Sequence, residues 1–303
     1  MMPAALRPGR ENRRLLLALA LGVLMLLVAA PAAFAGAITP ESGGSPNAGD
    51  ISTLYKITLY IAIVIFVAVE GALIWSLVKY RARRGGPAAE QIHGNTPLEV
   101  GWTIGAGVIV LILAAVTFVY LDDIRNPPAS GPNGLEVGSN IEFASINQPE
   151  PPGGNALKIH VNGQQYLWRY DYPGAGPNQE GQLFSYYKMV VPVDTTVVLE
   201  ITSQDVAHSW WIPKLGGKAD AIPGHTNETW FKISKPGLYE GQCAELCGDN
   251  HADMRAVVEA LPVDQYEAWA DKQRQEIKEA QQELAAARAR QERGATPGGG
   301  EQQ

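Results

Sequence analysis

Two long apolar stretches dominate the first 121 residues of the chain. The first reads ITLYIAIVIFVAVEGALIWSLV over residues 57–78, and the second reads VGWTIGAGVIVLILAAVTFVYL over residues 100–121. At about 1.5 Å per residue, each stretch would form a helix of about 33 Å, enough to cross the hydrocarbon core of a bilayer. The pattern predicts a hairpin of two transmembrane α-helices over residues 51–121.

Basic residues set the orientation of this hairpin. The segment between the two stretches, KYRARRGG, carries four of them. Because Lys and Arg beside membrane spans mark the cytoplasmic side, we expect everything after Leu121 on the extracytoplasmic face of the membrane. At the N-terminus, an Arg-rich segment, an apolar run and the small-residue site AFA predict a secretory signal peptide over residues 1–35. An uncleaved anchor there would leave the topology unchanged.

The pattern changes to strand-like alternation after a break. Residues 122–155 are rich in Pro, Gly, Asn and Ser, which predicts a linker or irregular insert. Residues 156–262 then contain short alternating segments such as ALKIHVNG and TVVLEITS, bounded by turn residues. Such a series predicts an all-β sandwich or barrel.

The end of the chain has a third character. Residues 263–293 favour a helix, and the spacing of Asp264 and Glu267 predicts a capping box with Asp264 as the N-cap. Residues 294–303, with the sequence GATPGGGEQQ, are expected to form a disordered tail.

The net charge of the chain is −7. Nucleic acid selects basic surfaces, so we do not expect it as a partner. An acidic surface would instead attract a basic protein partner.

Both cysteines lie in one twelve-residue segment, CAELCGDNHADM, which also contains His251 and Met254. A disulfide between Cys243 and Cys247 fits an exported domain, but it would close a very small loop and would not explain the other two residues. Two thiols, an imidazole and a thioether are soft donors that suit copper. His208 in DVAHSWWIP is the candidate second imidazole. Residue types alone favour copper and leave zinc and a disulfide open.

Two further histidines bear on the ligand set. His225 in IPGHTN is either a surface residue or a third candidate ligand, and His160 in a strand-like segment is expected to be structural.

The residues of these motifs and the order of the motifs along the chain resemble those of a known family. CAELCGDNHADM has the pattern C-x-E-x-C-x3-H-x2-M, and DVAHSWWIP, GGKADAIPG, HGNTPLEVGWTI and GQQYLWRYDYP appear around it. Together with the two-span topology, they resemble subunit II of bacterial cytochrome c oxidases over about residues 53–269. The resemblance implies a cupredoxin barrel that holds a binuclear copper centre, CuA.

That resemblance also implies a ligand set and a cofactor content. Two copper ions would be bridged by the thiolates of Cys243 and Cys247, and each ion would take one imidazole. The implied metal ligands are His208, Cys243, Glu245 through its backbone carbonyl, Cys247, His251 and Met254 as a weak axial donor. The Glu245 side chain would point toward a magnesium or manganese ion shared with subunit I.

The implied function is electron input to a terminal oxidase. Electrons from a reduced cytochrome c, or a similar periplasmic carrier, would pass through CuA to haem in subunit I, where oxygen is reduced to water with proton translocation. Subunits I and III and membrane lipid are the implied neighbours. The chain lacks the C-x-x-C-H motif of an attached haem, so the donor is expected to be a separate protein.

Other residues acquire roles by the same resemblance. Tyr166 and Trp168 match the aromatic patch where electrons are taken up, although the family commonly has Trp at the first of these positions. Glu99 matches the carboxylate at the mouth of a proton path into subunit I. Asp171 and Asp205 match acids that dock a basic cytochrome, whereas Gln204 and Tyr186 stand where carboxylates are frequent.

Two alternatives remain at this point. A quinol oxidase subunit II shares the fold and topology but has lost the copper ligands, which are complete here. A membrane-anchored copper-binding module would not need Glu99 or Glu245 at their positions in the motifs.

Overall fold

The computed structural model describes residues 38–81, 91, 93–135, 151, 156–172 and 183–294. The signal peptide predicted over residues 1–35 lies outside the described residues. So does the predicted disordered tail beyond Gly294, together with most of the second half of the predicted linker.

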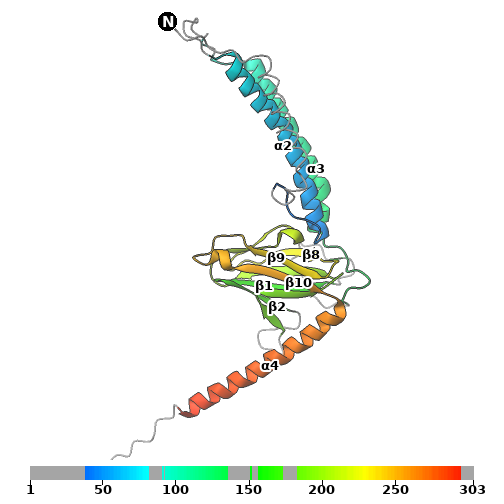
Figure 1. The fold of residues 1–303 in the computed structure, drawn as a ribbon, viewed down its shortest axis with the longest axis vertical. Coiled ribbons are helices and arrows are strands. Elements are labelled where there is room, and N and C mark those ends of the chain that lie inside the picture. The colour runs from blue at the N-terminus through cyan, green and yellow to red at the C-terminus, as the bar shows by residue number, and fades with distance from the viewer. Residues whose placement is uncertain are drawn as a thin grey trace, which may run out of the picture. The chain divides into compact units, whose positions relative to one another are not determined.

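Two long helices follow the first described residues. Helix α2 (Pro46–Lys79) and helix α3 (Thr96–Arg125) are both long and apolar enough to cross a membrane. They run side by side as a hairpin (Figure 1). The rest of the chain buries none of the most apolar part of either helix. This is expected for surfaces that face lipid or another membrane protein. The predicted hairpin is confirmed, with helices longer than the apolar stretches.

Within the described residues, ten strands form two five-stranded mixed sheets. In spatial order, the first sheet contains β3 (Phe184–Tyr186), β2 (Leu167–Asp171), β1 (Leu157–Gln164), β5 (Thr196–Ser203) and β8 (Asn227–Lys232). The second contains β4 (Lys188–Pro192), β10 (Arg255–Leu261), β9 (Gly237–Cys243), β6 (His208–Trp211) and β7 (Ala219–Ala221). Two 3₁₀ turns, η1 (Pro213–Leu215) and η2 (His251–Asp253), lie in the connections. The predicted all-β architecture is confirmed.

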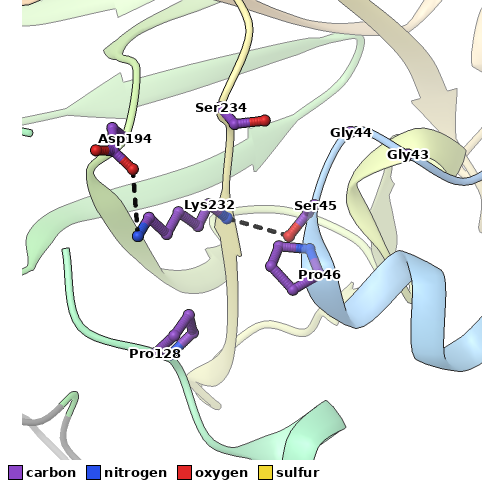
Figure 2. Close-up of a pocket in the computed structure, with 8 residues that line it drawn as sticks. All are labelled: Gly43, Gly44, Ser45, Pro46, Pro128, Asp194, Lys232 and Ser234. Atoms are coloured by element: carbon purple, nitrogen blue, oxygen red, sulfur yellow. Dashed lines mark hydrogen bonds and ion pairs between the residues drawn. The ribbon is translucent and has the colours of Figure 1, made fainter. Parts of the chain in front are cut away.

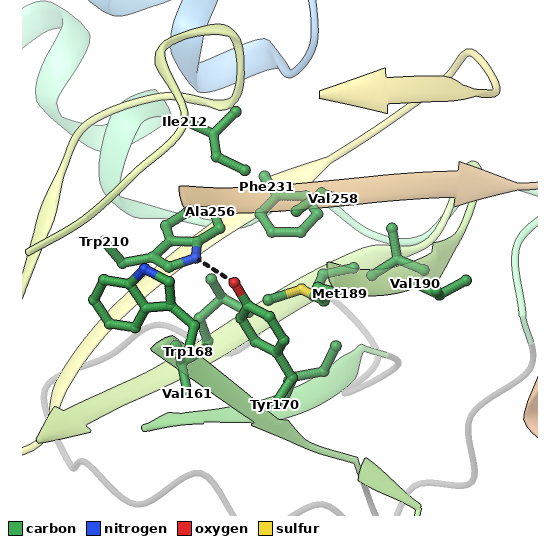
Figure 3. Packing of buried hydrophobic residues seen from close by; sticks show 14 of the residues in the cluster. Val161, Trp168, Tyr170, Met189, Val190, Trp210, Ile212, Phe231, Ala256 and Val258 are labelled. Carbon is green, nitrogen blue, oxygen red and sulfur yellow. Dashed lines mark hydrogen bonds between the residues drawn. The ribbon is translucent and has the colours of Figure 1, made fainter. Parts of the chain in front are cut away.

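Each sheet contains one parallel pair, β1 with β5 and β4 with β10, and its other neighbouring strands are antiparallel. Alternate side chains of the strands fill the space between the sheets, as the period of two requires. Figure 3 shows part of this core, where the indole of Trp210 stacks on Phe231 with ring centroids 6.2 Å apart. The same indole N–H donates to the hydroxyl of Tyr170 at 3.4 Å.

The strand β8 is tied to both helices of the hairpin through one residue. The amide of Asn47, in the first turn of α2, donates to the carbonyl of Trp230 at 2.9 Å. The indole of Trp230 donates to the carbonyl of Ile124, near the end of α3, at 3.0 Å. Trp230 is 6% exposed and packs with Ala156 and Val198 on the outer side of its sheet.

A small pocket lies beside this junction. In Figure 2, the ammonium of Lys232 on β8 lies 3.3 Å from the carboxylate of Asp194. The backbone N–H of Lys232 donates to the hydroxyl of Ser45, which precedes α2, at 3.1 Å. The Lys232 ammonium also donates to the carbonyl of Ala129 at 3.0 Å. The contact with Ala129 holds this part of the predicted linker against the barrel.

A long helix, α4 (Val263–Gly294), follows β10 directly. It packs on the barrel through Tyr266 and Ala270, which are 6% and 3% exposed and belong to the core cluster of the barrel. The prediction that Asp264 caps this helix is wrong. The carbonyl of Pro262 accepts a hydrogen bond from Tyr266 N at 2.9 Å, so the helix begins earlier and Asp264 lies in its first turn. There its charge favours the positive end of the helix dipole.

Candidate metal centre

One loop supplies most of the candidate ligands. It starts at Cys243, the last residue of β9, and ends at Met254, which precedes β10. The backbone N–H of Cys243 donates to the carbonyl of Met254 at 2.8 Å, so the two ends of the loop are held together. His251 opens the turn η2 inside this loop. The arrangement folds a twelve-residue stretch back on itself with its sulfur atoms inside.

His208 comes from a neighbouring strand. It is the first residue of β6, and β6 pairs with β9 so that Trp210 lies opposite Cys243. The imidazole is fully buried and contacts the indole of Trp168 edge to face, with ring centroids 5.9 Å apart. Gly163 makes room for both rings, because a Cβ there would lie 2.9 Å from His208 Cδ2.

The candidate donor atoms converge on one another. The two thiols lie 3.9 Å apart, Sγ to Sγ. Cys243 Sγ lies 3.8 Å from His208 Nδ1 and 3.2 Å from the Glu245 carbonyl oxygen. Cys247 Sγ lies 3.6 Å from His251 Nδ1 and 3.9 Å from Met254 Sδ. The ligand atoms of His208, Cys243 and Cys247 all lie within 4.8 Å of one another. Every residue in the predicted ligand set is therefore in one cluster.

The two cysteines are free thiols and do not form a disulfide. Their sulfur separation of 3.9 Å is well above the roughly 2.05 Å of a disulfide bond. It is also shorter than two metal–sulfur bonds of about 2.3 Å each, so one ion can contact both sulfurs. Two thiols, two imidazoles, a thioether and a carbonyl form a donor set that suits copper. The residues present thus fit a copper site.

Burial governs the protonation of this cluster. Burial, with the Cys243 thiol beside it, raises the pKa of the Cys247 thiol to about 11. The thiol therefore holds its proton at neutral pH when no cation is nearby, and metal binding has to displace it.

Asp205 orients the His208 ring. Its Oδ1 lies 2.9 Å from His208 Nε2. Its Oδ2 accepts the Gln165 backbone N–H at 2.7 Å, and the Val206 N–H donates to Oδ1 at 2.6 Å. Partial burial acts to raise the pKa of Asp205, but these hydrogen bonds lower it to about 2. An ionised carboxylate only accepts, so Nε2 carries the proton and Nδ1 keeps its lone pair for a metal.

One side of the cluster is open and the other is closed. Cys243 and Met254 are 1% and 0% exposed. On the open side, His251 is half-buried, Glu245 is exposed, and Leu246 beside it is 78% exposed. The exposed segment around Glu245 and Leu246 is where another protein can approach the site.

The two candidate electron-uptake residues differ in their surroundings. Trp168 is fully buried, with its ring against His208. Tyr166 is half-buried, and its hydroxyl accepts the backbone N–H of Asp249 at 3.1 Å. Tyr166 therefore lies between the surface and the ligand loop, whereas Trp168 lies in the core beside His208.

The candidate docking acids are both engaged. The guanidinium of Arg169 forms a two-nitrogen hydrogen-bonded ion pair with Asp171, with distances of 2.8 to 3.1 Å. The charge of Asp171 is therefore offset, whereas Asp205 is part of the His208 support described above. On the hairpin, Glu99 Oε1 accepts the backbone N–H of Asn95 at 3.0 Å and so caps the start of α3.

Histidines outside the motif do not join the cluster. His160 pairs with the buried Glu200, Nδ1 to Oε2 2.7 Å, which agrees with its predicted structural role. His225 is exposed in the connection between β7 and β8.

Sequence reasoning missed two residues beside the site. Asp205 was expected at a docking surface, although its position three residues before His208 was a signal for a supporting carboxylate. Gln165 carried no signal, since its contacts with Asp205 and Cys247 come only from the fold.

Comparison of the chain with known proteins shows which family it belongs to. Models described as cytochrome c oxidase subunit II, transmembrane domain and periplasmic domain, match residues 33–119 and 157–261. The cytochrome c oxidase subunit 2 of Synechocystis sp. is 32% identical over 248 residues, covering 74% of this chain and 73% of that protein. The chain belongs to the cytochrome c oxidase subunit II family. These matches confirm the predicted family. They also confirm the prediction of a membrane protein with a periplasmic domain.

Other members differ in length. The subunit 2 of Alkalihalophilus pseudofirmus is 32% identical over 230 residues, covering 76% of this chain, and this chain spans only 60% of that protein. The crystal structure of the periplasmic domain of subunit II of cytochrome oxidase of Bradyrhizobium japonicum is similar with 33% identity and a TM-score of 0.37. The matched region covers 40% of this chain and 96% of that domain.

Proposed function

We propose that this chain is the electron-input subunit of an aerobic terminal oxidase and holds a binuclear copper centre of the CuA type. The observation that supports it most is the cluster in which Cys243 Sγ and Cys247 Sγ lie 3.9 Å apart, each with an imidazole nitrogen within 3.8 Å. Electrons would come from a reduced cytochrome c or a similar periplasmic carrier. They would leave for haem in a partner subunit I, where oxygen is reduced to water with proton translocation.

The six donors have distinct parts in this proposal. The thiols of Cys243 and Cys247 and the imidazoles of His208 and His251 would hold the copper. Met254 Sδ and the Glu245 carbonyl are the weaker donors, one on each side of the thiol pair. A copper pair held by these residues would supply one-electron transfer.

The surrounding chain limits what changes when an electron arrives. The cluster has a fully buried thioether, a fully buried imidazole and a hydrogen bond that closes the base of its loop. Such a shell holds the ligands in fixed positions and keeps water from the closed side. Small geometric change between redox states favours fast electron transfer.

Uptake and delivery would use different parts of the open side. Tyr166 would meet the donor, with Trp168 packed against His208 in the core. Asp171 and Asp205 are proposed as acids near the docking surface for a basic donor, with the charge of Asp171 already offset by Arg169. The exposed Glu245 segment would face subunit I, where its carboxylate would reach a shared magnesium or manganese ion.

The membrane hairpin would join the partner subunits, with subunit I and subunit III as its neighbours. Glu99, at the cytoplasmic start of α3, would lie at the mouth of a proton path into subunit I. Its observed contact with Asn95 N is also a helix cap, and the two roles need separate tests.

The copper proposal is tested on the full-length chain in detergent. We expect two copper ions per chain and an electron paramagnetic resonance signal from one unpaired electron shared by both ions. Cys247→Ser should lose that signal, whereas His225→Gln, which changes an exposed histidine outside the cluster, should keep it. One copper with a mononuclear spectrum, or no bound copper, would overturn the proposal.

A further inference from the structure

The turn between β1 and β2 contacts two separate ligand-bearing segments of the cluster. This turn consists of Gln165 and Tyr166, between the ends of the two strands at Gln164 and Leu167. Neither residue supplies a donor atom to the cluster. Their contacts nevertheless reach the segment before His208 and the segment after Cys247.

The first contact is made by the backbone of Gln165. Its N–H donates to Asp205 Oδ2 at 2.7 Å, while the other oxygen of that carboxylate lies 2.9 Å from His208 Nε2. The carboxylate is therefore held at both oxygens, one by the turn and one by the imidazole. The backbone of the turn thus helps to hold the carboxylate that orients His208.

The second contact is made by the side chain of the same residue. The amide nitrogen Nε2 of Gln165 donates to the carbonyl of Cys247 at 2.5 Å. Close by, the Tyr166 hydroxyl accepts Asp249 N at 3.1 Å. Gly248 lies between these two contacts, and a Cβ there would lie 2.5 Å from the Tyr166 hydroxyl and 2.9 Å from Gln165 Nε2. The loop thus packs directly against the turn.

We propose that Gln165 is a positioning residue that couples His208 to Cys247 across the metal centre. This inference rests on the proposed copper function. One residue joins an imidazole on β6 to a thiol in the loop after β9, and the relative position of such ligands governs how tightly a metal is held. The side-chain amide is the separable half of this link, because its removal leaves the backbone contact with Asp205 in place.

The experiment compares variants of the full-length chain loaded with copper. Gln165→Glu has the same shape but cannot donate to the Cys247 carbonyl, and Gln165→Leu removes the polar group. For both, we expect copper loss to a competing chelator to be about tenfold faster, in the range found for residues that support metal ligands. The hyperfine pattern of the copper signal should also change, because Cys247 shifts relative to His208.

Gln164→Leu is the matched control. Gln164 is the neighbouring residue of the same type, and its amide donates to Gln204 at 2.5 Å, away from the ligands. Its loss should leave copper retention and the spectrum unchanged. Gln165→Lys, which restores a donor of similar reach, should recover most of the retention lost in Gln165→Leu.

The outcomes separate this inference from the copper proposal itself. If the unsubstituted chain binds two coppers and Gln165→Glu retains them as well, with the same spectrum, the coupling role is wrong and the metal centre stands. Equal copper loss in Gln164→Leu and Gln165→Leu would also overturn it. If the unsubstituted chain binds no copper pair, both proposals fall.

Discussion

The carboxylate of Asp205 lies 2.9 Å from Nε2 of His208, while Nδ1 of the same ring faces the Cys243 thiol at 3.8 Å. The two sides of the imidazole thus have different partners, an anion behind and a ligand cluster in front. A carboxylate in this position fixes the ring orientation and makes the free nitrogen a stronger donor.

Asp205→Ala should therefore weaken copper binding by about 10- to 100-fold. Chelator competition on the full-length chain measures this directly. Asp171→Ala is the control, because the Asp171 carboxylate pairs with Arg169 on the same strand. If Asp205→Ala changed only the affinity for the electron donor and left copper binding intact, the orienting role would be refuted.

Gly248→Ala should destabilise the folded protein by about 1–3 kcal/mol, the usual cost of a strained backbone residue. Gly248 has φ of +134°, and its added Cβ would also approach the Tyr166 hydroxyl to 2.5 Å. Gly237→Ala is matched for strain alone, since Gly237 has φ of +156° and open space around it. Thermal unfolding should show a loss in both variants, with impaired copper retention only in Gly248→Ala.

Tyr166 is predicted to act through its ring in electron uptake and through its hydroxyl in holding the loop. Tyr166→Phe keeps the ring but removes the acceptor for Asp249 N, so it should change copper retention more than uptake rate. Tyr166→Leu should slow reduction of the copper centre by the donor in stopped-flow measurements. Uptake at an unchanged rate in Tyr166→Leu would exclude this route.

Glu99→Gln separates the proposed proton role of Glu99 from its observed helix cap. Glutamine retains an oxygen that can accept Asn95 N, but it cannot carry a proton at neutral pH. We expect slower oxidase turnover in the assembled complex, with unchanged copper signals and unchanged helix content. Full turnover in Glu99→Gln, combined with a loss in Glu99→Ala, would mean that the residue serves only as a cap.

Glu200 should make the barrel acid-sensitive. Burial acts to raise its pKa, but hydrogen bonds from His160 and Lys158 outweigh burial and the pKa is lowered. Because the folded pKa is below the unfolded one, this contribution to stability is present above roughly pH 4.3 and is lost as pH falls through the folded value. Melting temperatures of the full chain between pH 3 and 7 (a range set by the roughly 4.3 pKa of free Glu) test this.

Glu200→Gln should flatten that pH dependence and cost about 3 kcal/mol at neutral pH, because it removes the carboxylate that pairs with the buried ammonium of Lys158. Glu228→Gln is the control of opposite sign. Glu228 lies opposite Glu200 in the sheet, and burial and the Glu200 charge raise its pKa. Its neutralisation should leave stability unchanged or improve it.

The cluster of candidate ligands was predictable because most of its residues are local in sequence. Cys243, Cys247, His251 and Met254 lie in one short loop, and His208 was found through its own motif. The architecture was predictable for a similar reason, since period-two alternation and long apolar runs are written directly along the chain.

What escaped prediction depends on contacts between distant segments. Gln165 meets Cys247 only because the turn after β1 lies beside the loop after β9, and no pattern within either segment records that. The assignment of Asp171 to a docking surface did not anticipate that Arg169, two residues away on the same face of β2, would offset its charge. Helix α4 begins earlier than predicted, because the carbonyl of Pro262 accepts the first hydrogen bond of the helix, from Tyr266 N.

The double attachment of Trp230 decides where the periplasmic part can be cut from the rest. Removing α2 and α3 would leave its carbonyl without Asn47 and its indole N–H without Ile124, and would uncover the apolar group it forms with Ala156 and Val198. A soluble fragment that begins at the first strand would therefore tend to self-associate through this patch. A polar replacement of Trp230 should keep such a fragment monomeric. The unsubstituted chain should be studied at full length in detergent.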